Sequence, residues 1–342
     1  MEQAVVAGGA GFIGSHLCAA LLARGMAVTC VDNLSTGRES NVAHLRNSPH
    51  FTLRIQDVTT IGDADLVDTL PSPPSYVFDL ASPASVVDYL RLPLETLRVN
   101  SQGTWNLLDL ARNAGARFLY ASTSEIYGDP LVHPQNEDYW GNVSPNGPRS
   151  CYDESKRFGE SLTMQYWRTY GLDCRVVRIF NTYGPYSRLD DGRVVPNFIG
   201  QALCGEPITI YGDGSQTRSF CYVSDLVAGL VSAMLVDNLG GQVFNLGNPE
   251  EHSIAEFAEI VSQLVAEQAG RAWVAEHHLV ARLDLPQDDP TRRRPDIDKA
   301  RRALGWEPRV SLRDGLQRTI AWFRDDLSSN AVAVAVASAG EE

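Results

Sequence analysis

Residues 4–14 read AVVAGGAGFIG, an apolar run that leads into glycines spaced Gly8-x-x-Gly11-x-x-Gly14. The apolar run is typical of a short buried strand, and the sequence continues with a helical pattern over 15–25 and a second apolar strand over 27–32. Glycines at such a strand-to-helix turn let backbone N–H groups approach a pyrophosphate at the N-terminus of the helix. This β-α-β unit predicts a dinucleotide site, and a glycine-rich turn without a ligand is the alternative.

The acidic residue at the end of the second strand indicates which dinucleotide binds. Asp32 is placed where a carboxylate accepts hydrogen bonds from a ribose and repels a 2′-phosphate. We therefore expect NAD, although the nearby Arg38 leaves NADP as an alternative.

Strand and helix patterns alternate through the first half of the chain. Further strands are expected at 51–58, 76–81, 117–121 and 172–180, and the longest helices at 94–114 and 152–170. This alternation predicts an α/β fold with a Rossmann-type, doubly wound parallel sheet. Ligands of such sheets bind at the carboxyl ends of the strands, where Asp57, Ser82 and Thr123 are expected.

The second half of the sequence predicts a smaller, mixed α/β substrate lobe. We expect residues 1–180 to form the NAD-binding lobe, with 219–246 returning to it. Residues 181–218 and 247–325 would form the nucleotide-sugar lobe. Residues 326–342 are expected to be a flexible tail, or at most a weak added strand.

Composition limits the function. The chain has 342 residues and a net charge of −13, which favours two lobes and argues against nucleic acid as a partner. Its six cysteines form no Cys-x-x-Cys pair, so we expect no metal site and a reduced, cytoplasmic protein. No apolar run reaches the roughly 18 residues of a membrane span, and the first strand begins too early to leave room for a signal peptide.

Two motifs in the middle of the chain predict redox chemistry on an alcohol. Tyr152 and Lys156 are four residues apart and share one face of a helix. An ammonium beside a phenol lowers the phenol pKa from its usual value of about 10. A tyrosine in that state can remove a hydroxyl proton while a hydride leaves the same carbon, and Thr123 can hydrogen-bond the same oxygen. A surface tyrosine beside a solvated lysine is the alternative.

Together these motifs resemble the extended short-chain dehydrogenase/reductase superfamily and, within it, the UDP-glucuronic acid decarboxylases. The residues that carry the resemblance lie at 8–14, 31–33, 80–85, 122–130, 147–157, 191–195, 211–218 and 293–297. The resemblance implies NAD-dependent oxidation of UDP-glucuronate at C4, decarboxylation of the 4-keto intermediate, and reduction to UDP-xylose. Ser124 stands where related 4,6-dehydratases have an acid, so a decarboxylase is favoured over a dehydratase.

The resemblance also assigns roles to individual residues. The implied catalytic residues are Tyr152, Lys156, Thr123, Ser124, Glu125 and Arg293. Glu125 would donate a proton to C5, directly or through a water, or would hydrogen-bond the sugar. The cofactor residues would be Gly8, Gly11, Phe12, Ile13, Gly14, Asp32, Asn33, Thr36, Gly37, Asp57, Val58, Leu80, Ser82, Tyr152, Lys156, Thr182 and Arg193. The substrate residues would be Arg98, Asn106, Asn181, Val195, Thr209, Tyr211, Gln216, Arg218 and Arg293.

Members of the superfamily commonly form homodimers by packing two helices from each subunit, here those expected at 94–114 and 152–170. Three other functions are left open. The first is release of a UDP-4-keto-pentose with NADH, and the second is nucleotide-sugar 4-epimerisation. The third, a non-catalytic NAD sensor, is disfavoured because both Tyr152 and Lys156 are present.

Overall fold

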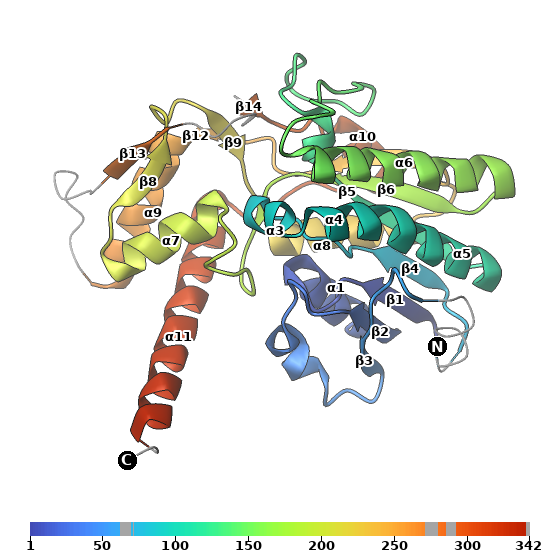
Figure 1. The fold of residues 1–342 in the computed structure, drawn as a ribbon, viewed down its shortest axis with the longest axis horizontal. Coiled ribbons are helices and arrows are strands. Elements are labelled where there is room, and N and C mark those ends of the chain that lie inside the picture. Colours follow the sequence, from blue (N-terminus) through green and yellow to red (C-terminus); the bar gives the residue numbers. More distant parts are fainter. Residues whose placement is uncertain (62–69, 71, 271–279, 285–291, 340–342) are drawn as a thin grey trace.

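The computed structural model describes residues 1–61, 70, 72–270, 280–284 and 292–339, with side chains described as far as residue 328. Its centre is a seven-stranded sheet in the order β11-β6-β5-β4-β1-β2-β3, with every neighbouring pair parallel (Figure 1). The strands are β1 (Gln3–Ala7), β2 (Ala27–Asp32), β3 (Phe51–Ile55), β4 (Tyr76–Asp79), β5 (Arg117–Thr123), β6 (Cys174–Ile179) and β11 (Gln242–Leu246). This order confirms the Rossmann-type sheet.

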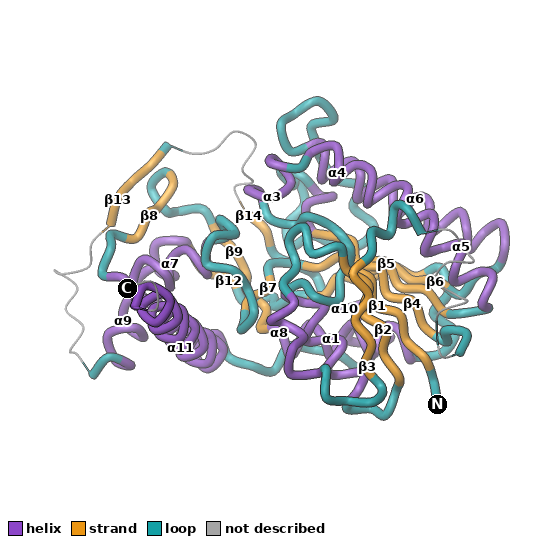
Figure 2. The backbone as a smooth tube through the Cα atoms, turned by 60° about the horizontal axis from the view of Figure 1, so that its bottom comes forward, coloured by secondary structure: helices purple, strands orange, loops and turns teal. Residues whose placement is uncertain are grey.

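Helices cover both faces of the sheet (Figure 2). One face carries α1 (Phe12–Leu22) and α8 (Val223–Leu235), and the other carries α4 (Pro93–Arg98), α5 (Thr104–Ala114) and α6 (Ser150–Tyr170). Successive side chains of β1 enter different cores, since Val6 packs in the cluster that includes Leu17 of α1 and Val5 packs in the cluster that includes Leu108 of α5. Burial on both sides therefore fixes the register of the central strands.

Two elements differ from the sequence-based expectation. The helix expected over 94–114 contains a π-helical segment, η2 (Val99–Gly103), between α4 and α5. Within it, the Asn100 side-chain amide donates to the hydroxyls of Ser82 and Ser155. The strand expected over 51–58 ends earlier, at Ile55, because the Asp57 carboxylate accepts the Thr59 N–H and closes a turn.

The smaller lobe contains short strands packed on helices. Its elements are α7 (Val194–Cys204), β8 (Ile208–Tyr211), β9 (Thr217–Ser219), β12 (Glu251–Ser253), α9 (Ile254–Gln268), β13 (Val280–Leu283) and β14 (Arg292–Arg293). Phe257 of α9 anchors its core, with ring centroids 4.3 Å from Phe220 and 5.9 Å from Phe198. Short pairing between β7 (Thr182–Tyr183) and β10 (Cys221–Tyr222) lies between this lobe and the large sheet. The exact lobe boundaries stay predictions.

The chain ends in two helices, α10 (Asp298–Leu304) and α11 (Leu312–Ala339). Residues 326–339, expected to be a flexible tail or an added strand, instead continue α11, which extends away from the body of the molecule (Figure 1). The alanine-rich sequence of this segment favours helix, because alanine has the highest helix propensity. No helix in the described part of the chain is long and apolar enough to span a membrane.

Candidate active site

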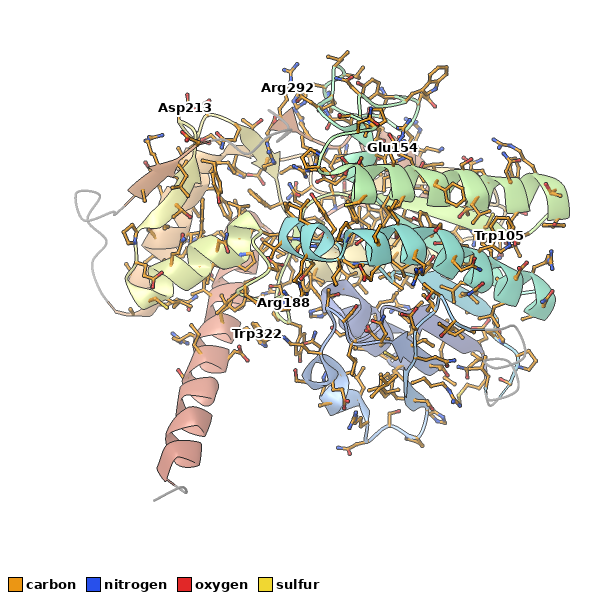
Figure 3. The ribbon with its side chains drawn as sticks, viewed as in Figure 1. Trp105, Glu154, Arg188, Asp213, Arg292 and Trp322 are labelled. Atoms are coloured by element: carbon orange, nitrogen blue, oxygen red, sulfur yellow. The ribbon has the colours of Figure 1, made fainter. Side chains whose placement is uncertain are left out.

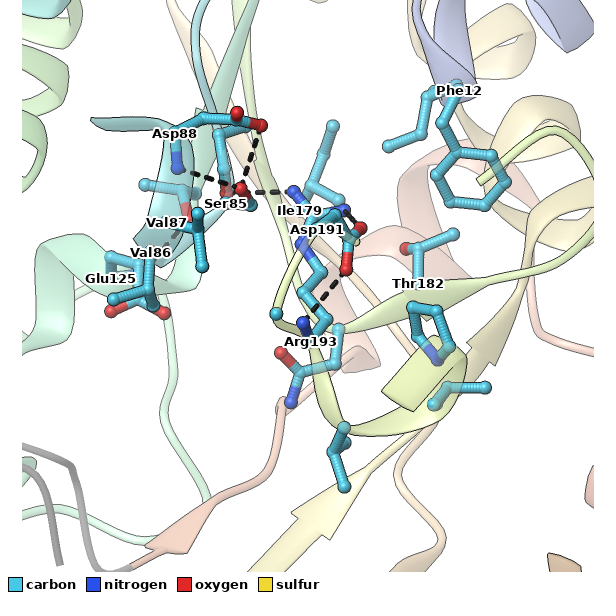
Figure 4. Close-up of a pocket in the computed structure, with 18 of the residues that line it drawn as sticks. Phe12, Ser85, Val86, Val87, Asp88, Glu125, Ile179, Thr182, Asp191 and Arg193 are labelled. Atoms are coloured by element: carbon cyan, nitrogen blue, oxygen red, sulfur yellow. Dashed lines mark hydrogen bonds and ion pairs between the residues drawn. The ribbon is translucent and has the colours of Figure 1, made fainter. Parts of the chain in front are cut away.

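Two adjoining cavities lie at the carboxyl ends of the large sheet's strands. The larger, part of whose lining is drawn in Figure 4, has a volume of about 670 Å³ and extends to the smaller lobe. The smaller has a volume of about 170 Å³ and lies beside β2 and the turn after β3. Residues that line both are Gly8, Gly11, Thr36, Leu80, Ser82. The pair therefore forms one continuous groove of a size that suits a nucleotide ligand.

The glycine loop leaves room for a close backbone approach. Gly8 has a φ of +74°, and a Cβ on Gly14 would lie 2.1 Å from the Gly8 carbonyl oxygen. Asp32 accepts the N–H groups of Ala10 and Leu34, both at 2.9 Å, and lines the smaller cavity. A carboxylate has about four acceptor positions, so two stay available for ribose hydroxyls. These residues fit a dinucleotide.

The smaller cavity is also lined by further expected cofactor residues. Asp57 accepts the Asn33 side-chain amide at 2.9 Å, and Val58 and Gly37 line the same wall. Arg38, which left NADP open, has its guanidinium 3.6 Å from the Asp190 carboxylate.

Tyr152 and Lys156 face the larger cavity from the first turns of α6. The Tyr152 ring stacks on Tyr89, with centroids 4.9 Å apart and an interplanar angle of 6°. Lys156 Nζ donates to the Ala121 carbonyl at 2.9 Å and lies 4.9 Å from the centre of the Tyr120 ring. Both side chains are thus fixed by packing before any ligand binds.

The direction of the Tyr152 pKa differs from the expectation. Burial raises the pKa of Tyr152 to about 12, although a hydrogen bond with Thr123 and the charge of Arg193 oppose that change. Burial also lowers the pKa of Lys156 to about 8. The net direction is opposite to the lowered pKa expected from the sequence, because desolvation of the buried phenol is the largest cause, while Lys156 Nζ lies 6.0 Å from the Tyr152 ring centre.

Glu125 is the centre of a buried ion cluster. It follows β5 in the short helix η3 (Ser124–Tyr127), where one carboxylate oxygen accepts Arg149 Nη2 at 2.5 Å and both accept from Arg293. Although burial alone would raise it, the charges of Arg293 and Arg149 bring the pKa of Glu125 down to about 2. A carboxylate with so low a pKa is a poor proton donor, so the geometry favours Glu125 as a fixed hydrogen-bond acceptor.

The smaller lobe contributes cations and polar groups to the opposite wall. The parallel register of β9 and β14 places Arg218 beside Arg293, and both side chains are buried. The other expected residues that line the larger cavity are Phe12, Ile13, Gly14, Thr123, Ser124, Asn181, Thr182, Arg193, Val195, Thr209, Tyr211 and Gln216. The tertiary fold therefore brings the catalytic residues and most of the expected substrate residues into one groove.

Two residues expected to contact the substrate lie elsewhere. Arg98 lines the smaller cavity, among the expected cofactor residues. Asn106 lines neither cavity; its amide donates to the Val58 carbonyl at 2.8 Å and accepts from Gln102 at 2.7 Å. Gly103 of η2 and Asn106 of α5 pack against the turn after β3, and the substrate roles of Arg98 and Asn106 stay predictions.

Sequence reasoning missed several residues of the larger cavity. Arg149 donates to Glu125, and Tyr89 stacks on Tyr152, as described above. Asp88 accepts the Ser85 hydroxyl at 2.8 Å (Figure 4). Asp153, next to Tyr152, does not line the cavity but is buried beside it, and burial together with the charge of Glu125 raises its pKa to about 7. Only Arg149 had a sequence signal, since it lies one helical turn before Tyr152.

Comparison with known proteins identifies the family. The family model for GDP-mannose 4,6 dehydratase matches residues 5–319. UDP-glucuronic acid decarboxylase 1 of Danio rerio is 51% identical over 330 residues, which cover 96% of this chain and 74% of that protein. The chain belongs to the UDP-glucuronic acid decarboxylase family. UDP-glucuronic acid decarboxylase 1 of Arabidopsis thaliana, another relative, is 50% identical over 321 residues, 94% of this chain and 69% of that protein.

Solved structures of related enzymes share the fold. UDP-glucose 4-epimerase of Thermotoga maritima, solved with UDP-glucose, has a TM-score of 0.83 and 30% identity over 95% of this chain and 99% of its own. UDP-glucuronic acid 4-epimerase of Bacillus cereus, solved with UDP-glucuronic acid and NAD, has a TM-score of 0.82 and 29% identity over 94% of this chain and 99% of its own. This chain thus has the same fold as these two epimerases, one of which was solved with NAD.

Proposed function

We propose that this chain catalyses the NAD-dependent decarboxylation of UDP-glucuronate to UDP-xylose. The observation that carries the proposal is the Glu125 carboxylate fixed between two guanidinium groups, on the cavity wall that also contains Tyr152. Two cations facing one anion leave positive charge for a sugar carboxylate. Ser124 is buried beside them and has no acidic group to protonate a leaving hydroxyl. Decarboxylase relatives at about half identity support the same activity.

The residues around C4 would handle protons and developing charge. Bound NAD⁺ would supply the hydride acceptor at C4 and later return that hydride. In the complex, bound NAD⁺ would add positive charge beside the phenol and favour its ionisation, so Tyr152 would act as the phenolate that takes up the C4 hydroxyl proton, and the Thr123 hydroxyl would hydrogen-bond the same substrate oxygen. The resulting 4-ketone is β to the carboxylate, so loss of CO₂ places negative charge on an oxygen that Tyr152 and Thr123 stabilise. A water held by Glu125 and Ser124 returns a proton to C5.

We also propose that the enzyme is a cytoplasmic homodimer. Helices α4, α5 and α6 expose large apolar side chains, including Trp105 at 46%, Phe158 at 45% and Trp167 at 40% of their area. Figure 3 shows Trp105 on α5. An apolar surface of this kind is typical of a subunit interface. All six cysteines are free thiols, which supports a reducing compartment.

A product assay tests the proposal and separates it from the alternatives. The protein is incubated with UDP-glucuronate and NAD⁺, released CO₂ is measured, and the sugar is identified by NMR. CO₂ with UDP-xylose supports the proposal, whereas accumulating NADH supports release of the 4-keto-pentose and UDP-galacturonate supports an epimerase. Tyr152→Phe is expected to abolish turnover while NAD⁺ binding stays measurable; turnover within severalfold of the wild type would refute the role of the phenol.

A further inference from the structure

The Lys156 ammonium is buried, and the groups in direct contact with it are neutral. Its side chain is 3% exposed, and Nζ donates to the Ala121 carbonyl while lying over the rings of Tyr120 and Tyr152. Burial raises the pKa values of both tyrosines, so neither provides a negative charge near neutral pH. A buried ammonium is costly unless an anion compensates it.

One carboxylate lies on the same side of the sheet. Asp79 ends β4, is 2% exposed, and pairs in the parallel register with Tyr120 of β5. Paired residues of neighbouring strands project to the same face, so the Asp79 side chain lies on the face where the Tyr120 ring meets Lys156 Nζ. Asp79 and the catalytic lysine are therefore buried on the same face of the sheet.

The hydrogen bonds that Asp79 accepts stabilise its ionised carboxylate, but they do not neutralise its charge. One oxygen accepts the Thr104 hydroxyl at 2.8 Å, and the other accepts the Ala81 N–H at 3.3 Å. Both donors are neutral. Burial raises the pKa of the Asp79 carboxyl, and the charge of Lys156 and the two hydrogen bonds act against that change.

The other carboxylate near Lys156 has a cation of its own. Glu160 lies one helical turn further along α6 and accepts Arg178 Nη2 at 2.9 Å, Arg178 Nε at 3.0 Å and the Ser122 hydroxyl at 2.5 Å. This bidentate ion pair compensates the Glu160 charge. Of these two described carboxylates, Asp79 is therefore the one whose negative charge can compensate the Lys156 ammonium.

We propose that the Asp79 carboxylate is the buried counter-ion of the Lys156 ammonium and holds that charge beneath the catalytic phenol. Asp79 is a positioning residue, since it acts through Lys156 and lines neither cavity. Its effect on turnover rests on the proposed function. Its effect on the charge of Lys156 does not, because that charge can be measured in protein that is not turning over.

The composition of the chain makes this measurement simple. The sequence contains only two lysines, Lys156 and Lys299. Protein labelled with ¹³C at the lysine Cε therefore gives two NMR signals, and Lys299→Arg identifies the Lys156 signal. Titration of that signal reports the pKa of Lys156, which burial lowers to about 8 in the wild type.

Asp79→Asn is the decisive variant because asparagine keeps the size and can still accept from Thr104. We expect the pKa of Lys156 to fall by a further ~1–2 units in this variant. Asp225→Asn is the matched control, since it neutralises another buried carboxylate, which accepts the N–H groups of Arg309 and Val310. It is expected to leave the Lys156 titration unchanged. Asp79→Ser, which can also hydrogen-bond Thr104, is the second variant if the first does not fold.

The alkaline limb of the pH–rate profile gives a second readout. If Lys156 must be protonated for turnover, this limb moves to lower pH in Asp79→Asn by the same amount as the NMR pKa, whereas a merely structural defect lowers the rate equally at every pH. An unchanged Lys156 titration in folded Asp79→Asn, or an equal shift in Asp225→Asn, would overturn the proposal. The wild type could lack decarboxylase activity while the Lys156 pKa still falls in Asp79→Asn. That result would support Asp79 as the counter-ion and would refute only the proposed function.

Discussion

Neutralising Glu125 without changing its size is the most direct test of the buried ion cluster. In Glu125→Gln the side chain can still accept a hydrogen bond, but its charge is lost opposite Arg149 and Arg293. The cluster lowers the Glu125 pKa from an ordinary 4.5 to about 2. Since each pKa unit corresponds to about 1.4 kcal/mol, the charge stabilises the folded protein by about 3 kcal/mol at pH 7.

The pH dependence of this difference has a definite sign. The Glu125 pKa is lower in the folded than in the unfolded state, so its stabilisation is complete above about pH 4.5 and is lost as the pH falls toward 2. The stability difference between wild type and variant is therefore full at pH 7 and reduced by roughly half at pH 3. A difference that rises on acidification would contradict the ionisation state assigned to Glu125.

Urea unfolding followed by circular dichroism measures both quantities, because urea does not screen charges. The control is Glu154→Gln, which removes a partly exposed ion pair in which Arg157 Nε lies 3.5 Å from the Glu154 carboxylate. This variant should change the free energy of unfolding by less than about 1 kcal/mol. Glu125→Gln could instead match the wild type in unfolding free energy at pH 7 within about 1 kcal/mol. The cost of desolvating these charges would then equal their attraction, and the stabilisation assigned to the Glu125 charge would be refuted.

Three further predictions concern the cofactor, the dimer and the contact between α8 and the segment before α11. Gly14→Ala should abolish NAD⁺ binding in calorimetry because its Cβ meets the Gly8 carbonyl, whereas Gly200→Ala should not; retained affinity would contradict the placement of the glycine loop. Phe158→Glu should convert a dimer to monomer in size-exclusion chromatography with light scattering, and an unchanged mass would exclude α6 from the interface. Asp225→Ala should lower the unfolding free energy by about 2–3 kcal/mol, since two backbone N–H groups lose their acceptor; a loss under about 1 kcal/mol would argue against those bonds.

The residues predicted best are those whose role depends on neighbours in the chain. The glycine loop and Asp32 belong to one β-α-β unit, and Tyr152 and Lys156 share one helix, so spacing alone relates them. Arg98 and Asn106 do not line the larger cavity, which the sequence could not foresee, because a helical pattern shows which residues share a face but not which element that face meets. The π-helical segment in the same helix also depends on a distant residue, since Asn100 bonds Ser155 of α6.

The sequence by itself determined the alternation of strands and helices, the glycine turn and the helical face that carries the phenol and the lysine. These are local properties, because backbone geometry and residue spacing decide them. Only the tertiary structure decided the charge states: it brings Arg293 to Glu125 across 168 residues of sequence and buries Asp79 and Lys156 on the same face of the sheet. Ionisation depends on desolvation and on the distance to other charges, and both exist only after the chain has folded.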